Sequence, residues 1–257
     1  MEQKTEESVR FFTRIAPRYD LGIIQWWMKK FQEGVIQEID GTKPLTLLDT
    51  ACGTGELLLT LQDKVHPKSR LCGIDITERM LEIAEKKLPK TTTVEKQDVH
   101  DLKFKNNSFD YVISTEAFHH YANQKKALGE MCRVARKEVI VVDVEFFFKA
   151  VHRMFAFVEP GCVKINTPKE MKMLFEEAGL KEIKQRRNFL FSMVTSGKKT
   201  KTSRLCPRSV LKVRLFGHFH DFSDKIAFYT QCVHFHDNTA DVMTDDFAEH
   251  FIDLCSP

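Results

Sequence analysis

The sequence predicts an α/β fold with a doubly wound, mostly parallel sheet and helices on both faces. Hydrophobic spacing switches repeatedly between strand-like and helix-like periods over residues 45–195. The strand candidates are short and apolar, and residues 138–144 are nearly all β-branched, as in strands buried on both faces. Helical segments of about ten residues separate the strands, a pattern typical of parallel strands joined by crossover helices.

The chain alternates helix and strand in a regular order. Two segments before the sheet, 5–15 and 21–39, have the apolar spacing of helices. Five strand candidates follow, each a short apolar run: 45–49, 71–76, 92–97, 109–115 and 138–144. Helices are expected among them over 55–64, 78–88 and near 124–135. Thr77 is placed to cap the helix 78–88.

Residues 167–179 carry the start and stop signals of a further helix. Thr167 and Glu170 have the spacing of a capping box, Pro168 suits the first turn, and Gly179 suits the end. Two paired strands are expected after this helix, over 180–188 and 189–195. They would complete the sheet.

The alternation stops near Gly197, where a short polar and basic stretch reads as a linker. We divide the chain into an N-terminal helical segment, a sheet domain and a C-terminal extension, over 1–40, 41–199 and 200–257. The extension carries two similar segments with His218, His220, His234 and His236. Two strands could present these imidazoles to a metal; the alternative is a hydrophobic hairpin with histidine as half-polar filler. No metal site is predicted elsewhere.

Composition favours a soluble, cytoplasmic protein. The net charge of +3 is small for 257 residues and argues against nucleic-acid binding. The seven cysteines are odd in number and lack C-x-x-C spacing, which favours reduced thiols over disulfides or a zinc site. The first residues, MEQKTEESVRFF, lack the apolar core of a signal peptide, and no apolar run reaches the length of a membrane span.

The stretch LLDTACGTGELLLTL, residues 47–61, places two glycines between a strand and a helix. In a doubly wound sheet the loop after the first strand faces the ligand crevice, and glycine lets a ligand approach the backbone. Asp75 ends the second strand 20 residues beyond Gly55, at the distance where an acid reaches ribose hydroxyls. Asp98 ends the third strand. Leu58 replaces the third glycine of a dinucleotide loop, and no P-loop lysine follows.

Residues 8–199 resemble the class I S-adenosylmethionine-dependent methyltransferases, of the small-molecule group that includes the ubiquinone and menaquinone methyltransferases. The matching motifs are Asp49-x-Ala51-Cys52-Gly53-Thr54-Gly55, Gly73-Ile74-Asp75, Gln97-Asp98, Ser108-Phe109-Asp110-Tyr111-Val112 and Phe118-His119-His120, with Ala16-Pro17-Arg18-Tyr19-Asp20 before them. The resemblance implies a Rossmann-like, seven-stranded sheet with one antiparallel strand near its edge.

The resemblance also implies a site for S-adenosyl-L-methionine. Its expected residues are Tyr19, Asp49, Ala51, Cys52, Gly53, Gly55, Asp75, Ile76, Asp98, Val99 and Ser114. Asp49 and the glycine backbone would hold the methionine part, Asp75 the ribose, and Asp98 with Val99 the adenine. The chain lacks the Met-Asn pair that follows Tyr-Asp in the quinone enzymes, and their Pro-Gly-Gly turn before the fifth strand. These departures leave the quinone acceptor open.

Methyl transfer from a sulfonium requires mainly alignment of the acceptor for in-line displacement. A base is needed where the acceptor must lose a proton, and His119 and His120 are the candidates, with Glu116 a weaker one. Local packing at a helix start is the alternative role for these histidines. Aromatic residues, namely Trp26, Trp27, Phe31 and Phe146–Phe148, would line an apolar acceptor pocket or belong to the core.

The resemblance to the small-molecule group leads us to expect a small or lipid-like acceptor. One alternative is a protein or RNA methyltransferase in which basic residues hold a polyanion: Lys164, Lys169, Arg186 and Arg187. Another is a non-catalytic binding module. In that case the extension 200–257, rich in phenylalanine, would contact a protein partner.

Overall fold

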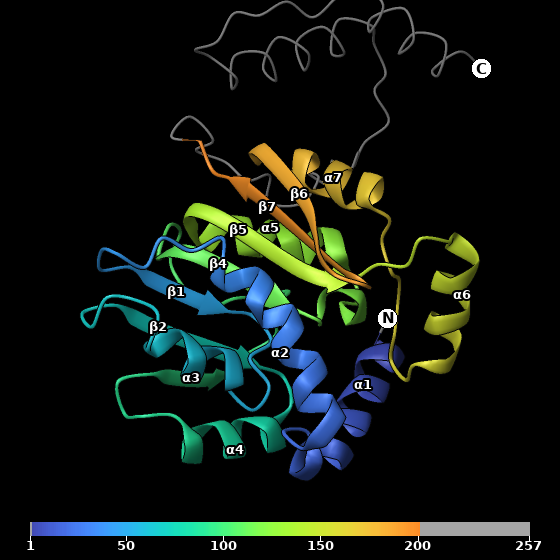
Figure 1. The fold of residues 1–257 in the computed structure, drawn as a ribbon, viewed down its shortest axis with the longest axis horizontal. Coiled ribbons are helices and arrows are strands. Elements are labelled where there is room, and N and C mark those ends of the chain that lie inside the picture. The colour runs from blue at the N-terminus through green and yellow to red at the C-terminus, as the bar shows by residue number, and fades with distance from the viewer. Residues whose placement is uncertain (1, 201–257) are drawn as a thin grey trace, which may run out of the picture. The chain divides into compact units, whose positions relative to one another are not determined.

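The computed structural model describes residues 2–200 of the chain. The predictions made for residues 201–257, including the four histidines of the extension and its protein partner, lie outside the described residues. Seven strands form one sheet in the described part, in the order β3-β2-β1-β4-β5-β7-β6 (Figure 1). Their bounds are β1 Thr46–Asp49, β2 Arg70–Asp75, β3 Thr93–Lys96, β4 Phe109–Thr115, β5 Ala135–Val144, β6 Lys181–Phe189 and β7 Ser192–Lys198.

The strand directions match the prediction. Strands β1 to β5 pair in parallel, and β7 runs antiparallel to both of its neighbours, β5 and β6. The sheet therefore has one antiparallel strand, next to its edge. Parallel pairing brings the carboxyl ends of β1, β2 and β4 to the same edge of the sheet, so the loops that follow them meet there.

Seven α-helices accompany the sheet in residues 2–200. Their bounds are α1 Glu2–Ile15, α2 Gly22–Ile36, α3 Glu56–Gln62, α4 Glu78–Lys87, α5 Gln124–Val134, α6 Lys149–Val158 and α7 Pro168–Glu177. Short 3-10 helices, η1 and η2, occupy Ala16–Arg18 and Phe118–His120. The predicted capping box at the start of α7 is present, with reciprocal hydrogen bonds between Thr167 and Glu170.

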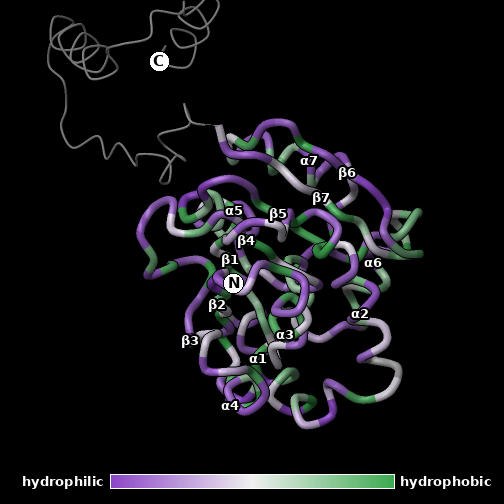
Figure 2. The backbone as a smooth tube through the Cα atoms, turned by 60° about the vertical axis from the view of Figure 1, so that its left-hand side comes forward, coloured by the Kyte–Doolittle hydropathy of each residue, from purple (hydrophilic) through white to green (hydrophobic). Residues whose placement is uncertain are grey.

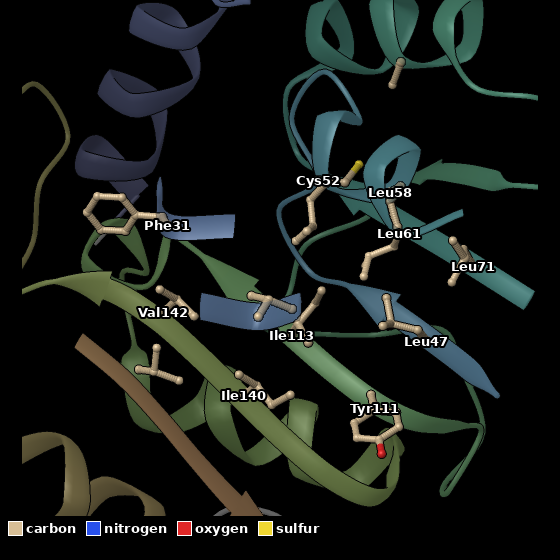
Figure 3. Close-up of a cluster of buried hydrophobic side chains, with 14 of the residues drawn as sticks. Phe31, Leu47, Cys52, Leu58, Leu61, Leu71, Tyr111, Ile113, Ile140 and Val142 are labelled. Carbon is tan, nitrogen blue, oxygen red and sulfur yellow. The ribbon is translucent and has the colours of Figure 1, made fainter. Parts of the chain in front are cut away.

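Side chains of alternate strand residues build a core on each face of the sheet. Figure 3 shows one of them, with residues from α2, α3 and five strand and loop segments: Phe31, Leu47, Cys52, Leu58, Leu61, Leu71, Tyr111, Ile113, Ile140 and Val142. On the other face Leu48, Val112 and Val139 pack with residues of α5 and α7. Because the period of a strand is two, neighbours such as Leu47 and Leu48 point to opposite faces. Hydrophobic stretches accordingly run through the region of the central strands in Figure 2.

One helix of the structure was not predicted, and one predicted cap differs in detail. Helix α6 was not expected, because Phe148 at its N-cap provides no capping side chain and the segment is rich in aromatic residues. Thr77 does occupy the N-cap of α4, but its hydroxyl makes no capping bond. Instead, the Thr77 N–H donates to Asp75 Oδ1 at 2.7 Å. The carboxylate that ends β2 thus stabilises the start of α4.

Within residues 2–200, none of the helices has both the length and the apolar character needed to cross a lipid bilayer. The cytoplasmic location expected from the sequence stays a prediction.

Candidate active site

A cavity lies at the carboxyl edge of the sheet, between the strand ends and the N-terminal helices. Figure 1 shows how α1 and α2 are arranged relative to the sheet. Residues at the ends of β1 to β4 or just beyond them form one side of the cavity, among them Asp49, Ala51, Cys52, Gly53, Asp75, Ile76, Asp98, Val99 and Glu116. The other side comes from α1, η1 and α2, with Phe12, Tyr19, Met28 and Gln32. Nine of the expected cofactor residues therefore line one cavity: Tyr19, Asp49, Ala51, Cys52, Gly53, Asp75, Ile76, Asp98 and Val99.

The loop after β1 is held in a tight turn. The Cys52 N–H donates to Ile74 O and the Gly55 N–H to Cys52 O, both at 2.9 Å. Gly53 and Gly55 have φ values of 52° and 79°, in the left-handed region that favours glycine. A Cβ on Gly55 would lie 2.8 Å from Leu88 Cδ1, whereas one on Gly53 would approach only Tyr19, at 3.9 Å. Gly55 thus permits the packing of α3 on α4, and Gly53 leaves the backbone open to the cavity.

Two buried carboxyl groups flank this loop. Asp49 Oδ1 has no hydrogen-bond partner, and burial raises the pKa of Asp49 to about 7. Asp75 is better satisfied, since its Oδ2 accepts from the Gly53 N–H at 2.9 Å and its Oδ1 from the Thr77 N–H. Burial nevertheless raises the pKa of Asp75. Asp49 therefore offers an unused acceptor to a ligand with an N–H or a positive charge.

Asp98 lines the cavity from the loop after β3. Its carboxylate is half exposed and accepts from the backbone N–H of His100 at 2.9 Å. The His100 ring, at 2.5 Å from the same oxygen, lowers the pKa of Asp98. The next residue, Val99, is buried and apolar. The Asp98 carboxylate can accept a hydrogen bond from an exocyclic amino group, and the apolar side chain of Val99 can pack against the flat ring that carries it.

Two expected cofactor residues, Ser114 and Gly55, lie behind the cavity wall. The Ser114 hydroxyl is fully buried and is 2.9 Å from the hydroxyl of Tyr121, which itself lines the cavity. Tyr121 also contacts Thr50 Oγ1 at 3.1 Å. Sequence reasoning missed Tyr121, because its place between Ser114 and the cavity depends on the path of the loop after β4.

The N-terminal segment is tied to the glycine loop by Asp20. Its carboxylate accepts from Thr54 Oγ1 at 2.6 Å and pairs with Lys87 Nζ at 2.5 Å. Tyr19, next to it, lines the cavity, and burial raises the pKa of its hydroxyl. The Tyr19 hydroxyl donates to Met28 Sδ at 3.6 Å. These contacts fix η1 and α2 over the loop.

Glu116 is the first residue beyond β4, with a φ of 51° that is unusual for a residue with a side chain. Its N–H donates to Val142 O at 2.7 Å, and its Oε1 accepts from Trp27 Nε1 at 2.6 Å. Its Oε2 is buried without a partner, and burial raises the pKa of Glu116 to about 8. Strain at functional sites is common, and here it aims a carboxyl group at the cavity.

His119 and His120 occupy η2 but face different surroundings. His119 lies 2.6 Å from Asp143 Oδ1 through Nδ1 and 3.3 Å from Glu159 Oε2 through Nε2. Burial disfavours its charged form, but the carboxylates of Asp143 and Glu159 together outweigh burial and raise the pKa of His119 to about 10. His120 lines the cavity, and burial lowers its pKa. Although burial opposes it, the nearby imidazoles of His119 and His120 lower the pKa of Glu159 to about 2.

Comparison with known proteins agrees with this geometry. The sequence model of a family described as "Methyltransferase domain" matches residues 42–182. The demethylmenaquinone methyltransferase of Staphylococcus aureus strain JH9 is 30% identical over 211 residues, covering 70% of this chain and 88% of that protein.

The chain belongs to the methyltransferase domain family.

Solved methyltransferase structures share its fold. A chain from the complex of the Haloferax volcanii Trm112 methyltransferase activator has a TM-score of 0.63 at 18% identity, and covers 73% of this chain and 96% of that one. A SAM-dependent methyltransferase from Aquifex aeolicus has a TM-score of 0.53 at 22% identity, with coverages of 65% and 88%. The chain is a class I methyltransferase with S-adenosyl-L-methionine as its cofactor. The unpartnered Asp49 Oδ1 and the open Gly53 backbone fit that cofactor.

The methyltransferase has a second cavity beside the first. It is lined mainly by apolar side chains, namely Phe11, Phe12, Ile15, Tyr19, Trp27 and Met28, with Glu116, His120 and Glu159 as its ionisable groups. The two cavities share Phe12, Tyr19, Met28, Glu116 and His120. A molecule in the second cavity would therefore contact the same side chains as the cofactor.

The other aromatic candidates have different places in the methyltransferase. Phe31 belongs to the core, and Phe147 and Phe148 are exposed. Of the basic residues considered for a polyanion, Lys164, Arg186 and Arg187 pair with Glu170, Glu38 and Glu145. These ion pairs compensate the positive charges that would hold a polyanion in a protein or RNA methyltransferase.

Proposed function

We propose that this methyltransferase transfers a methyl group to a small, apolar or lipid-like acceptor bound in the second cavity. One observation carries the proposal: the mainly apolar cavity shares five lining residues with the cofactor cavity. Apolar side chains bind an apolar ligand by removing its surface from water. The printed name of the S. aureus relative, which refers to demethylmenaquinone, agrees with such an acceptor.

The proposed cofactor contacts follow the sequence interpretation. Asp49 and the Gly53 backbone bind the methionine part, Asp75 the ribose, and Asp98 with Val99 the adenine. The bound cofactor supplies a methyl group already activated by the sulfonium. The N-terminal segment covers the site through Phe12, Tyr19 and Met28, which line the cavity opposite the strand ends. This segment excludes water and holds the acceptor against the residues that line both cavities. It thereby aligns the acceptor with the methyl group, and such alignment lowers the barrier by up to about 7–11 kcal/mol in well-oriented reactions.

The proton of a hydroxyl or carbon acid acceptor would pass to Glu116. Its Oε2 has no partner and the side chain lines both cavities, while Trp27 fixes the other oxygen. A pKa of about 8 gives a base matched to neutral solution. A positive charge in the cofactor cavity would favour the carboxylate form. Proton removal by His119 or His120 stays a prediction.

The test is product profiling with methyl-labelled S-adenosyl-L-methionine against metabolite, lipid, protein and RNA fractions. We expect label in a lipid-extractable or small apolar product. Glu116→Gln should reduce the rate at saturating cofactor by about 100-fold or more. Glu33→Gln, on the exposed face of α2, is the matched control. Label confined to protein or RNA would refute the acceptor class.

A further inference from the structure

Three donor side chains meet where the loop after β4 approaches the end of α6. His119, His120 and Glu159 each offer one ligand atom, and these atoms lie within 4.8 Å of one another. The backbone fixes the approach, because the Val163 N–H donates to His119 O at 2.8 Å. Imidazole nitrogen and carboxylate oxygen are the donors that zinc and related divalent ions prefer in proteins.

The donor atoms lie near the spacing found around a metal ion, with a different oxygen of Glu159 nearest to each imidazole. A tetrahedral ion with bonds of 2.0–2.1 Å separates its ligand atoms by about 3.4 Å. His119 Nε2 lies 3.3 Å from Glu159 Oε2, and His120 Nε2 lies 3.7 Å from Glu159 Oε1. Despite its distance, the first pair is not aligned as a hydrogen bond, and both of its atoms are buried without a partner. Buried polar atoms without partners are rare in native structures, and these two face each other.

Asp143 supplies the support that metal-binding histidines usually have. Its Oδ1 accepts from His119 Nδ1 at 2.6 Å, which turns His119 Nε2 toward Glu159. A carboxylate behind a ligand histidine fixes the ring and raises its basicity. Asp143 is buried at the end of β5. Its position therefore orients one donor rather than adding another.

The recorded ion pairs of Asp143 and Glu159 within residues 2–200 are with histidine and not with lysine or arginine. A divalent cation would compensate the buried carboxylate of Asp143 and the partly exposed one of Glu159.

We infer that His119, His120 and Glu159 form a binding site for one divalent transition-metal ion such as Zn²⁺, with Asp143 as a positioning residue. Three protein ligands leave one coordination position open. His120 and Glu159 line the second cavity, so an open position there would face the acceptor. Only that last statement rests on the proposed function.

The experiment is a Co²⁺ titration of the full chain without cofactor or acceptor, followed by visible ligand-field absorption. To exclude metal binding by the histidines of the extension, the titration uses a parent variant in which four residues are replaced by Asn: His218, His220, His234 and His236. We expect one Co²⁺ per chain in this parent, with bands of the intensity typical of tetrahedral sites, displaced by one equivalent of Zn²⁺. No Co²⁺ bands in this parent would overturn the inference.

Variants in this parent locate the site. Glu159→Gln and His120→Asn should weaken Co²⁺ binding more than roughly 100-fold, and Asp143→Asn by roughly 10–100-fold with the bands retained. His66→Asn, in the turn before β2, is the matched control and should bind as the parent does. Unchanged affinity in Glu159→Gln would also overturn the inference. If His120→Asn fails to fold, the isosteric and partly exposed Glu159→Gln decides alone. Because the readout is spectroscopic, a failed methylation assay would leave this result standing.

Discussion

Asp49 and Glu116 are the two acids on which the cofactor site depends most. Each has an oxygen that is buried without a partner, and burial raises the pKa values to about 7 and about 8. Both face the cavity in which an ammonium and a sulfonium are proposed to lie. Opposite charge favours the carboxylate form, so cofactor binding and proton release are linked.

Cofactor binding should therefore release protons near pH 7. Calorimetry in phosphate and in Tris, whose ionisation enthalpies differ, measures the number released. We expect release with S-adenosyl-L-methionine and less with S-adenosylhomocysteine, which keeps the ammonium but lacks the sulfonium charge. Asp49→Asn should remove the proton release that is common to both ligands, because both carry the ammonium group. Equal binding enthalpies in both buffers would contradict this linkage.

Glu116→Gln should stabilise the apo protein increasingly as pH rises. The pKa of Glu116 is about 8 in the folded chain, against an ordinary value of 4.5 for a solvent-exposed glutamate. Between these values the folded state holds a proton that the unfolded state has released, so stability falls with pH. Glutamine lacks this dependence and still accepts from Trp27. The measurement is Tm at pH 5 and pH 8, and a smaller gain at pH 8 would exclude the raised pKa.

At the scale of elements, Asp110 joins three strands on the side opposite the site. From β4 it accepts from the Thr46 N–H of β1 at 2.9 Å and pairs with Arg136 and Lys137 of β5 at 2.9 and 3.1 Å. Burial opposes its charge, but hydrogen bonds led by Arg136 lower the pKa of Asp110 well below its usual range. This carboxylate holds the central strands in register and so holds the loops at their other ends.

Asp110→Asn should lower the free energy of unfolding by about 1–3 kcal/mol at pH 7. Since the folded pKa lies below the unfolded value, the stability from this group is present above pH 3.8 and declines below it. The difference between variant and parent, measured by urea unfolding, should shrink as pH falls from 4 to 3. A constant difference would show that the charge of Asp110 is not responsible.

At the scale of the whole molecule, both cavities are built from the first 160 residues. The residues that line them lie between Thr5 and Glu159, and the core residues of the described part end at Val194. The proposed domain division at residue 200 therefore separates the site from the C-terminal extension in the sequence.

A chain that ends after Thr200 should bind S-adenosyl-L-methionine within about 0.5 kcal/mol of the full chain, the scatter of changes remote from a site. Calorimetry on both chains measures this. A chain that ends after Lys181, which lacks β7 and most of β6, is the control expected to unfold, because β7 pairs with β5. If the chain that ends after Thr200 failed to bind the cofactor, the extension would be part of the site.

Sequence alone determined the sheet, the glycine loop and the acids at the strand ends. These features are local: strand and helix periods span a few residues, and parallel strands bring their ends to one edge whatever the details of packing. The match to the family rests on the same local motifs. Helix α6 was not predicted, because its N-cap residue, Phe148, provides no capping side chain.

Only the tertiary structure decided the contacts between distant segments. Trp27 meets Glu116 across 89 positions, and Glu159 reaches His119 from the end of α6. The raised pKa of Glu116, the second cavity and the cluster of metal donors all depend on such meetings. No pattern within one segment specifies them, because burial and distance are set by how the segments pack.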